Sequence, residues 1–367
     1  MKTPPLDLVL VSTPIGYLGS GRGGGVELTM ISLIKGLLSL GHKITLIAPQ
    51  GSVLPSDCSA AVIKHVPGID QPSWQHQKVS APVVIPPDAV LLGLWEQALD
   101  LGRSSDAVLN FSYDWLPIWL TPRVDACLFH LISMGAVSQV MKTLITDLSK
   151  SDPSRLAFHT YRQAFDYQLS SQPFVVGNGF DLHRYKFQPQ GGGALGWAGR
   201  VAPEKGLEDA VAVAAALGHQ LLVWGVIEDA EYAKQIEADH PQGTIDWRGF
   251  LPTDQLQEQL RSCRALLNTP KWNEAYGNVV VEAMACGVPV IAYDRGGPGE
   301  LITSGLNGWL VPPDDLEAMI EVTLQIEKID RRECRKWVER FASHDGFAMR
   351  IESWIKKGIK ANRELSS

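Results

Sequence analysis

Residues 272–292 constrain the fold more than any other part of the chain, because they carry a loop, a helix and a strand in that order. Gly277 and Asn278 mark a helix start, and Gly287 marks its end. The β-rich run that follows has Pro289 near its beginning, where a strand tolerates proline. A short helix that leads directly into a buried strand predicts an α/β unit with a parallel sheet.

The junction between this loop and this helix predicts an anion site. The first amides of a helix have no partners within it, and the helix dipole is positive at that end. We therefore expect an anion near Gly277, Asn278 and Val279. Glu274 precedes them and Glu282 lies within the helix. Phosphate oxygens need donors and sugar hydroxyls can use carboxylate acceptors, so a sugar nucleotide fits both; taken alone, the two acids are ordinary surface charges.

The spacing of these acids carries a family resemblance. Glu274, seven residues and Glu282, followed by Ala-Met-Ala-Cys-Gly-Val-Pro-Val, resemble the signature of the family-4 retaining glycosyltransferases, which have the GT-B fold. Similar motifs continue on both sides, in residues 195–200, 204–207, 296–300 and 307–311. The resemblance is strong over about residues 175–315 and weaker before them.

The length of 367 residues exceeds what one hydrophobic core usually serves and predicts two domains. The resemblance implies an α/β protein of the GT-B class, with two Rossmann-like doubly wound parallel-sheet domains facing across a cleft. Residues 1–187 would bind the acceptor, and residues 188–344 the nucleotide sugar. Residues 188–193 read as the linker, and residues 345–367 are expected to form a helix that crosses back to the first domain.

Periodicity and turn residues predict the order of strands and helices. In the first domain we expect strands at 6–11, 43–48, 106–111 and 126–130, helices at 26–40 and 155–168, and an irregular segment at 51–90. In the second we expect strands at 194–198, 220–225, 244–247, 265–269 and 288–293, with helices at 206–217, 229–238, 253–262 and 278–286.

Composition excludes several classes of protein. The formal charge of -7 lies wholly after residue 187, and neither half has the basic patch that nucleic acid or anionic lipid requires. The five cysteines have neither metal-type nor Cys-x-x-Cys spacing, which indicates reduced thiols. Nothing resembles a signal peptide or a membrane span. We expect a cytoplasmic protein without stable membrane association.

The first βα turn contains Gly19, Gly21 and Gly24 in the spacing Gly-x-Gly-x-x-Gly, so an NAD-dependent oxidoreductase must be considered. These glycines begin well after the strand, and the next strand ends without an acid for a ribose hydroxyl. The resembled family has a Gly-Gly loop in this place, which implies that Gly24 and Gly25 cradle a donor pyrophosphate. A plain hinge loop is the alternative.

Arg200 and Lys205 are the predicted cations of the site. Cleavage of a sugar–pyrophosphate bond builds negative charge on the diphosphate, which fixed cations stabilise. The two residues flank a strand-to-helix loop and could converge on one anion, although two solvated surface cations are the alternative. The sequence has no Asp-x-Asp arrangement for Mg²⁺ or Mn²⁺, so we expect no metal.

The resemblance assigns roles to individual residues. It implies that Glu274 accepts hydrogen bonds from the donor sugar, that Glu282 accepts them from the ribose, and that the backbone near Leu251 faces the base. His130 is expected at the C-terminal end of a strand, where the family has a histidine near the transferred sugar; a structural histidine is the alternative. Glu274, His130, Arg200 and Lys205 are the predicted catalytic residues.

The leading hypothesis is a metal-independent, retaining glycosyltransferase that uses a UDP-sugar, with UDP-glucose as the expected donor. The first half of the chain is rich in aromatic residues that could stack on a flat acceptor. The whole chain looks like the cyanobacterial UDP-glucose:tetrahydrobiopterin glucosyltransferases, which implies a reduced pterin acceptor. The alternatives are a sugar-nucleotide epimerase or phosphorylase on the same fold, the NAD-dependent enzyme, and a protein that senses a sugar nucleotide without catalysis.

Overall fold

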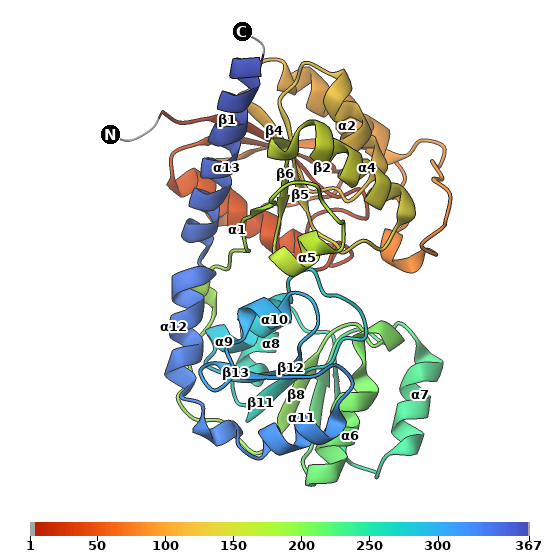
Figure 1. Ribbon diagram of the computed structural model, residues 1–367, viewed down its shortest axis with the longest axis vertical. Helices are drawn as coiled ribbons and strands as arrows, with labels where there is room; N and C mark the ends of the chain where they lie inside the picture. Colours follow the sequence, from red (N-terminus) through yellow and green to blue (C-terminus); the bar gives the residue numbers. More distant parts are fainter. Residues whose placement is uncertain (1–3, 366–367) are drawn as a thin grey trace. The chain divides into compact units, whose positions relative to one another are not determined.

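The computed structural model describes residues 4–365, which form two compact units (Figure 1). The first unit combines the chain up to Phe180 with the chain from His344 onward, and the second runs from Asp181 to Ser343. The structure thus divides the chain at 180–181 and 343–344. The division at 180–181 comes seven residues earlier in the chain than the predicted boundary at 187–188, which was placed by the glycine-rich stretch that follows it.

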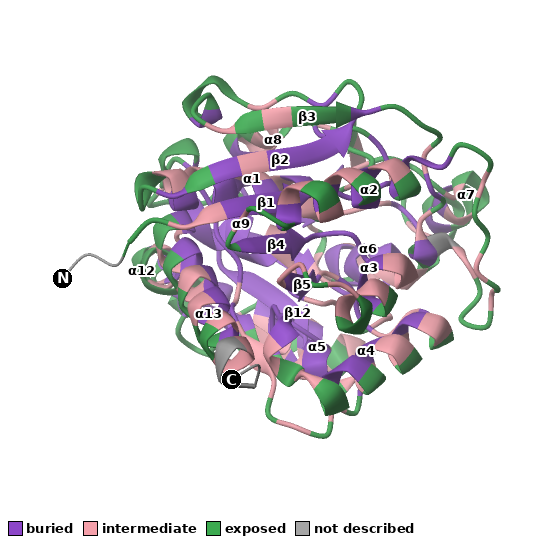
Figure 2. Cartoon of the chain, turned by 90° about the horizontal axis from the view of Figure 1, so that it is seen from above, coloured by how far each residue is buried: buried purple, intermediate pink, exposed green. Residues whose placement is uncertain are grey.

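A seven-stranded parallel sheet forms the first unit, in the order β3-β2-β1-β4-β5-β6-β7. Its strands are β1 (Asp7–Val11), β2 (Lys43–Pro49), β3 (Val62–Val66), β4 (Ala107–Asn110), β5 (Leu128–Ile132), β6 (Leu156–Phe158) and β7 (Phe174–Val175). Its helices are α1 (Gly25–Ser39), α2 (Val90–Gly102), α3 (Trp115–Leu120), α4 (Gln139–Ser151), α5 (Tyr161–Phe165) and α13 (His344–Leu365). The central strands β4 and β5 are buried over their whole length (Figure 2).

Helix α13 packs beside α1, although some three hundred residues separate them in sequence (Figure 1). The two helices meet at Gly36, where an added Cβ would lie 2.7 Å from the Cβ of Ala348, so the close approach requires glycine. Trp354 packs edge-on against Phe129 of β5, with ring centroids 5.2 Å apart. Because Trp354 and Phe347 are almost fully buried, α13 supplies part of the core of the first unit.

The second unit contains a six-stranded parallel sheet in the order β10-β9-β8-β11-β12-β13. Its strands are β8 (Leu195–Ala198), β9 (Leu221–Trp224), β10 (Ile245–Gly249), β11 (Ala265–Asn268), β12 (Val290–Tyr293) and β13 (Gly308–Val311). Its helices are α6 (Leu207–Leu217), α7 (Ala230–Asp239), α8 (Thr253–Leu260), α9 (Asn278–Ala285), α10 (Pro298–Leu301), α11 (Leu316–Thr323) and α12 (Arg331–Phe341). Alternating strands and helices place the carboxyl ends of all six strands at one edge.

Two predictions about the first unit are wrong, and a third is confirmed with different bounds. The helix predicted at 155–168 contains β6 instead, because Leu156–Phe158 pairs with β5, and only Tyr161–Phe165 is helical. The segment 51–90 is not wholly irregular, since it holds β3 at the sheet's edge. The strand predicted at 126–130 is β5, which continues to Ile132.

In the part of the chain that the structure describes, no helix is long and apolar enough to cross a membrane. All five cysteines, Cys58, Cys127, Cys263, Cys286 and Cys334, are free thiols.

Candidate active site

The predicted donor-site residues of the second unit gather at the carboxyl edge of its sheet. Arg200 follows β8, Lys205 ends a 3-10 turn (Pro203–Lys205) before α6, and Glu274 lies between β11 and α9. The strands β8 and β11 are direct neighbours in the sheet. Their following loops therefore meet, as expected where parallel strands end.

Lys205 and Glu274 form an ion pair within this group. Trp272 completes the cluster, because its Nε1 donates to Glu274 Oε1 at 2.9 Å and its ring lies 4.6 Å from Lys205 Nζ. Burial raises the pKa of Glu274, but the charge and hydrogen bond of Lys205, with help from Trp272 and Arg200, outweigh burial and hold that pKa below its ordinary value. Glu274 is thus a carboxylate near neutral pH and can accept hydrogen bonds from hydroxyl groups.

Backbone contacts fix the two loops that carry this pair. The amide of Lys271 donates to Glu204 O at 2.9 Å, and Thr269 Oγ1 donates to Gly206 O at 2.7 Å. Gly206 has φ +64°, and a Cβ there would collide with the Thr269 carbonyl. The geometry of the pair is therefore set by the main chain as well as by charge.

Arg200 is held differently from Lys205. Its guanidinium donates to Glu204 at 2.7 Å and also contacts Glu228. In this structure the two predicted cations are each engaged by carboxylates. Among the described residues, no group of three or more His, Cys, Asp or Glu side chains is arranged to hold a metal ion.

The start of α9 is shaped by glycines. Gly277, the residue at the N-cap of the helix, has φ +97° and, as a glycine, has no side chain that could cap it. Gly297 donates its amide to Glu274 O at 2.7 Å, and a Cβ on Gly296 would lie 2.5 Å from that same oxygen. The predicted anion-site residues Gly277, Asn278 and Val279 are thus placed next to the Glu274 loop.

Glu282 lies on the second turn of α9 and is buried. Its Oε1 accepts a hydrogen bond from the hydroxyl of Tyr185 at 3.0 Å. Burial raises the pKa of Glu282 to about 7, although the Tyr185 hydrogen bond and the charge of Arg184 act in the opposite direction. The two predicted acids therefore have opposite pKa shifts.

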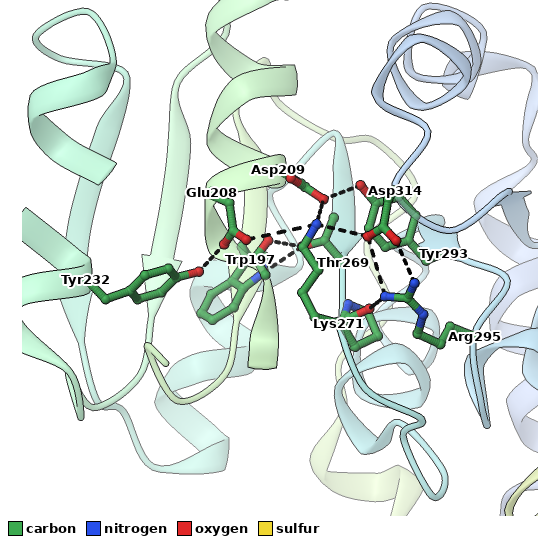
Figure 3. A network of polar contacts seen from close by, with 11 residues as sticks. Trp197, Glu208, Asp209, Tyr232, Thr269, Lys271, Tyr293, Arg295 and Asp314 are labelled. Atoms are coloured by element: carbon green, nitrogen blue, oxygen red, sulfur yellow. Dashed lines mark hydrogen bonds and ion pairs between the residues drawn. The ribbon is translucent and has the colours of Figure 1, made fainter. Parts of the chain in front are cut away.

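Lys271 is the centre of a polar network beside the site (Figure 3). Its ammonium contacts Asp209 of α6 and donates to Asp314 at 3.0 Å, while Arg295 binds Asp314 at 2.7 Å. Asp209 also accepts from the hydroxyl of Tyr293. Burial lowers the pKa of Lys271, but its bonds to Asp209 and Asp314 outweigh burial and raise that pKa. The network joins the loops after β11, β12 and β13 to the first turn of α6.

His130 belongs to the first unit and is fully buried in the middle of β5, so the predicted position at the end of the strand is wrong. Its Nδ1 lies 3.1 Å from Asn110 Nδ2, and its Nε2 lies 2.6 Å from Thr121 Oγ1. Burial, with a smaller contribution from Arg155, lowers the pKa of His130 to about 3. The ring is thus neutral, with both nitrogens engaged in the core.

The glycine-rich loop of the first unit encloses a carboxylate of its own chain. Glu27 accepts hydrogen bonds from the amides of Gly19 at 2.7 Å and Gly23 at 2.8 Å, and Gly21 lies at 3.4 Å. The amide of Gly24 donates to Gly21 O. Most of the loop's donors therefore point to internal acceptors, as in a backbone nest that holds an anion.

Aromatic residues of the first unit divide into core and pocket. Trp95, Phe111 and Phe129 are buried in the core. Trp74, which is also buried, and Trp115 line a small recess that contains Asp114. Burial raises the pKa of Asp114 to about 6, against hydrogen bonds from Trp115, Leu116 and Trp74.

Sequence reasoning missed several of these residues. Trp272 and Lys271 adjoin Glu274, so their proximity could have been noticed. No local signal marks Asp209 or Tyr185, whose partners lie 62 and 97 residues away in sequence.

Comparisons with known proteins agree with the predicted fold and with a nucleotide-sugar-dependent second domain. Residues 186–344, nearly the same range as the predicted second domain, match the family model described as "Glycosyl transferases group 1". Over 139 residues the chain is 35% identical to the 2-deoxystreptamine N-acetyl-D-glucosaminyltransferase of Streptomyces fradiae, covering 36% of this chain and 33% of that protein. It is 32% identical over 146 residues to a GDP-mannose-dependent alpha-mannosyltransferase of Mycobacterium tuberculosis, covering 40% and 37%. The matched part of the chain thus spans only about a third of the length of these relatives.

Solved structures match over nearly the whole chain. AviGT4, a glycosyltransferase involved in avilamycin A biosynthesis, has a TM-score of 0.74 and 20% identity, covering 97% of this chain and 98% of that one. Anabaena Alr3699/HepE in complex with UDP-glucose has a TM-score of 0.72 and 18% identity, covering 96% and 100%. At this identity the likeness concerns the fold, and it confirms the predicted GT-B class of two Rossmann-like parallel-sheet units. Over residues 186–344 the chain is therefore similar to the glycosyl transferases group 1 family.

Proposed function

We propose that this chain is a retaining, metal-independent glycosyltransferase that moves a hexose from a UDP-sugar to a small acceptor. The Lys205–Glu274–Trp272 cluster carries the proposal. It places a cation, which suits a diphosphate, against a low-pKa carboxylate, which suits sugar hydroxyls. Both lie beside the start of α9, where backbone amides favour an anion.

Each residue then has a defined task in the reaction. The bond between the anomeric carbon and the diphosphate breaks, and its electrons leave with the diphosphate. Lys205 and Arg200 stabilise that charge, while Glu274 orients the sugar through its hydroxyls. The anomeric carbon forms its new bond with a nucleophilic atom of the acceptor, which loses a proton. Retention of the anomeric configuration is adopted from the family resemblance.

UDP-glucose is the donor we propose, and the base would stack near Leu251 and the exposed ring of Phe250. Support comes from the fold match to Alr3699/HepE, which is described in complex with UDP-glucose. The sequence relatives include enzymes named for GDP-mannose and N-acetylglucosamine, so donors must be compared directly. Turnover of UDP-glucose, UDP-N-acetylglucosamine and GDP-mannose, read by mass spectrometry, makes that comparison.

A flat, hydrogen-bonding heterocycle such as a reduced pterin is the acceptor we propose. Support comes from the resemblance of the whole chain to pterin glucosyltransferases and from the many aromatic residues of its first half. Acceptor screening with reduced pterins, flavonoid-like rings and simple sugars tests this choice. Glycosylation of simple sugars alone would contradict it.

The hydrogen bonds within the Gly19–Gly25 loop argue against the nicotinamide alternative. Its loop would need free amides for a pyrophosphate, whereas those of Gly19 and Gly23 donate to Glu27. Tight binding of NADH in a fluorescence titration would restore it.

Arg200→Ala and Lys205→Ala test the proposed function. Each is expected to lower kcat by about 10²–10³, because a charge-stabilising contact to the leaving group is lost. Lys234→Ala is the matched control, since Lys234 is an exposed lysine of α7 that pairs with Glu231. Rates of both site variants within about tenfold of the wild type would overturn the assignment.

A further inference from the structure

Tyr185 lies outside every motif discussed above, yet it contacts Glu282, the residue proposed to bind the ribose of the nucleotide. It is 6% exposed, and its hydroxyl donates to Glu282 Oε1 at 3.0 Å. In the described part of the chain, no residue donates a hydrogen bond to the other oxygen, Oε2. The carboxylate is therefore anchored through one oxygen, which leaves the second for a further donor.

Helix α12 fixes the main chain of Tyr185. Arg335 Nη1 donates to Tyr185 O and to Ala285 O, both at 2.8 Å. Ala285 is the last residue of α9, the helix that carries Glu282. One guanidinium thus fastens the Tyr185 segment to the end of that helix, so the tyrosine is positioned independently of any ligand.

We propose that Tyr185 is a positioning residue of the nucleotide site, which holds Glu282 so that Oε2 accepts a hydrogen bond from a ribose hydroxyl. This inference rests on the proposed function, which assigns Glu282 to the ribose. A buried carboxylate with one oxygen fixed has fewer orientations to lose when a ligand binds. Removal of the tyrosine hydroxyl should therefore weaken nucleotide binding, although the hydroxyl itself makes no contact with the nucleotide.

The charge state of Glu282 gives this role a pH signature. Tyr185 and Arg184 are the titratable groups that act on the pKa of Glu282, and Glu282 in turn raises the pKa of Cys286. Burial raises the pKa of Glu282 to about 7, and the Tyr185 hydroxyl opposes that rise. Without the hydroxyl the pKa moves higher still, so a larger fraction is protonated near neutral pH. Because the ionised form is the better acceptor, the loss of affinity should shrink as pH rises.

Calorimetric titration with UDP between about pH 6.5 and pH 8.5 tests the inference. Tyr185→Phe is expected to weaken UDP about fivefold near pH 7, with a deficit that narrows toward the upper end. Glu282→Gln should weaken UDP as well, and adding Tyr185→Phe to it should cause no further loss. Tyr232→Phe is the matched control, because that hydroxyl also donates to an acid, Glu208, and should leave UDP affinity unchanged.

The outcomes separate the two proposals. If Glu282→Gln weakens UDP and Tyr185→Phe does not, the positioning role is wrong and the donor site stands. A Tyr185→Phe deficit that is constant with pH, or that persists in the Glu282→Gln background, reflects general disruption and also overturns the role. If the wild type fails to bind UDP, the donor site and this inference fall together. Thermal unfolding of each variant identifies any that is unfolded, and the double-variant comparison then decides the question.

Discussion

Two glutamates of one motif have opposite pKa shifts, and their immediate partners explain why. Glu274 is buried, but the ammonium of Lys205 keeps its pKa below the ordinary value. Glu282 is buried beside a neutral tyrosine hydroxyl, which compensates burial only in part, so its pKa rises to about 7. The sequence motif alone does not distinguish the chemical behaviour of the two acids. Their partners lie 69 and 97 residues away, so their chemistry depends on packing that local patterns do not encode.

Glu282→Gln should change how stability depends on pH. The folded-state pKa of about 7 exceeds the ordinary 4.5, so the folded protein binds this proton more tightly than the unfolded chain. The resulting stabilisation is complete below about pH 4.5 and is lost as pH rises through about 7. As the pH rises between these limits, the free energy of unfolding of the wild type should fall by about 3 kcal/mol relative to that of the glutamine variant. Urea unfolding of both proteins at acidic and alkaline pH measures this difference, and parallel pH curves would refute it.

The elements vary in how well local signals predict them. Helix α1 is predicted well because Met30, Leu33 and Ile34 recur with a helical period and are all buried. The strand β6 has only three residues, too few to show a period, and its pairing with β5 overrides the helical appearance of its surroundings. The edge strand β3 is mostly exposed, so it lacks the regular alternation that would mark one buried face.

The loop before α1 gives a prediction at this scale. Glu27→Ala leaves the amides of Gly19 and Gly23 without their acceptor and should destabilise the protein by about 2–3 kcal/mol. Glu27→Gln should cost less, because the side-chain carbonyl can keep one of these bonds. Glu96→Ala, at an exposed position of α2, is the control and should stay within about 0.5 kcal/mol of the wild type. If Glu27→Ala leaves the free energy of unfolding in denaturant unchanged, the loop does not depend on this carboxylate.

At the scale of the whole molecule, the sequence predicts the fold. It predicts only part of the order in which the segments of the first unit are connected. The alternation of strands and helices leads to two parallel sheets. The contact between α13 and the first unit was implied by family resemblance, since no local pattern in residues 345–367 reveals which surface that helix covers. Gly36 and Ala348 meet only because the helix returns from the far end of the described chain.

Trp354→Ala probes this return. Its ring is 2% exposed, packs against Phe129, and donates from Nε1 to Ser154 O at 2.7 Å. Loss of the indole should destabilise the first unit by about 3–5 kcal/mol. Calorimetry should show the first unit melting earlier, while the stabilisation of the second unit by UDP is unchanged. Met349→Ala, at an exposed position of the same helix, is the control; equal effects of the two variants would refute a core role for Trp354.

The discontinuous first unit also sets the order in which a newly made chain can mature. A ribosome delivers α13 after every residue of the second unit, so the inner unit can complete its core while the outer one still lacks Phe347 and Trp354. The early-synthesised sheet must therefore wait, with apolar surface uncovered, for its last helix. Chaperones should therefore be needed until α13 has docked on the first unit.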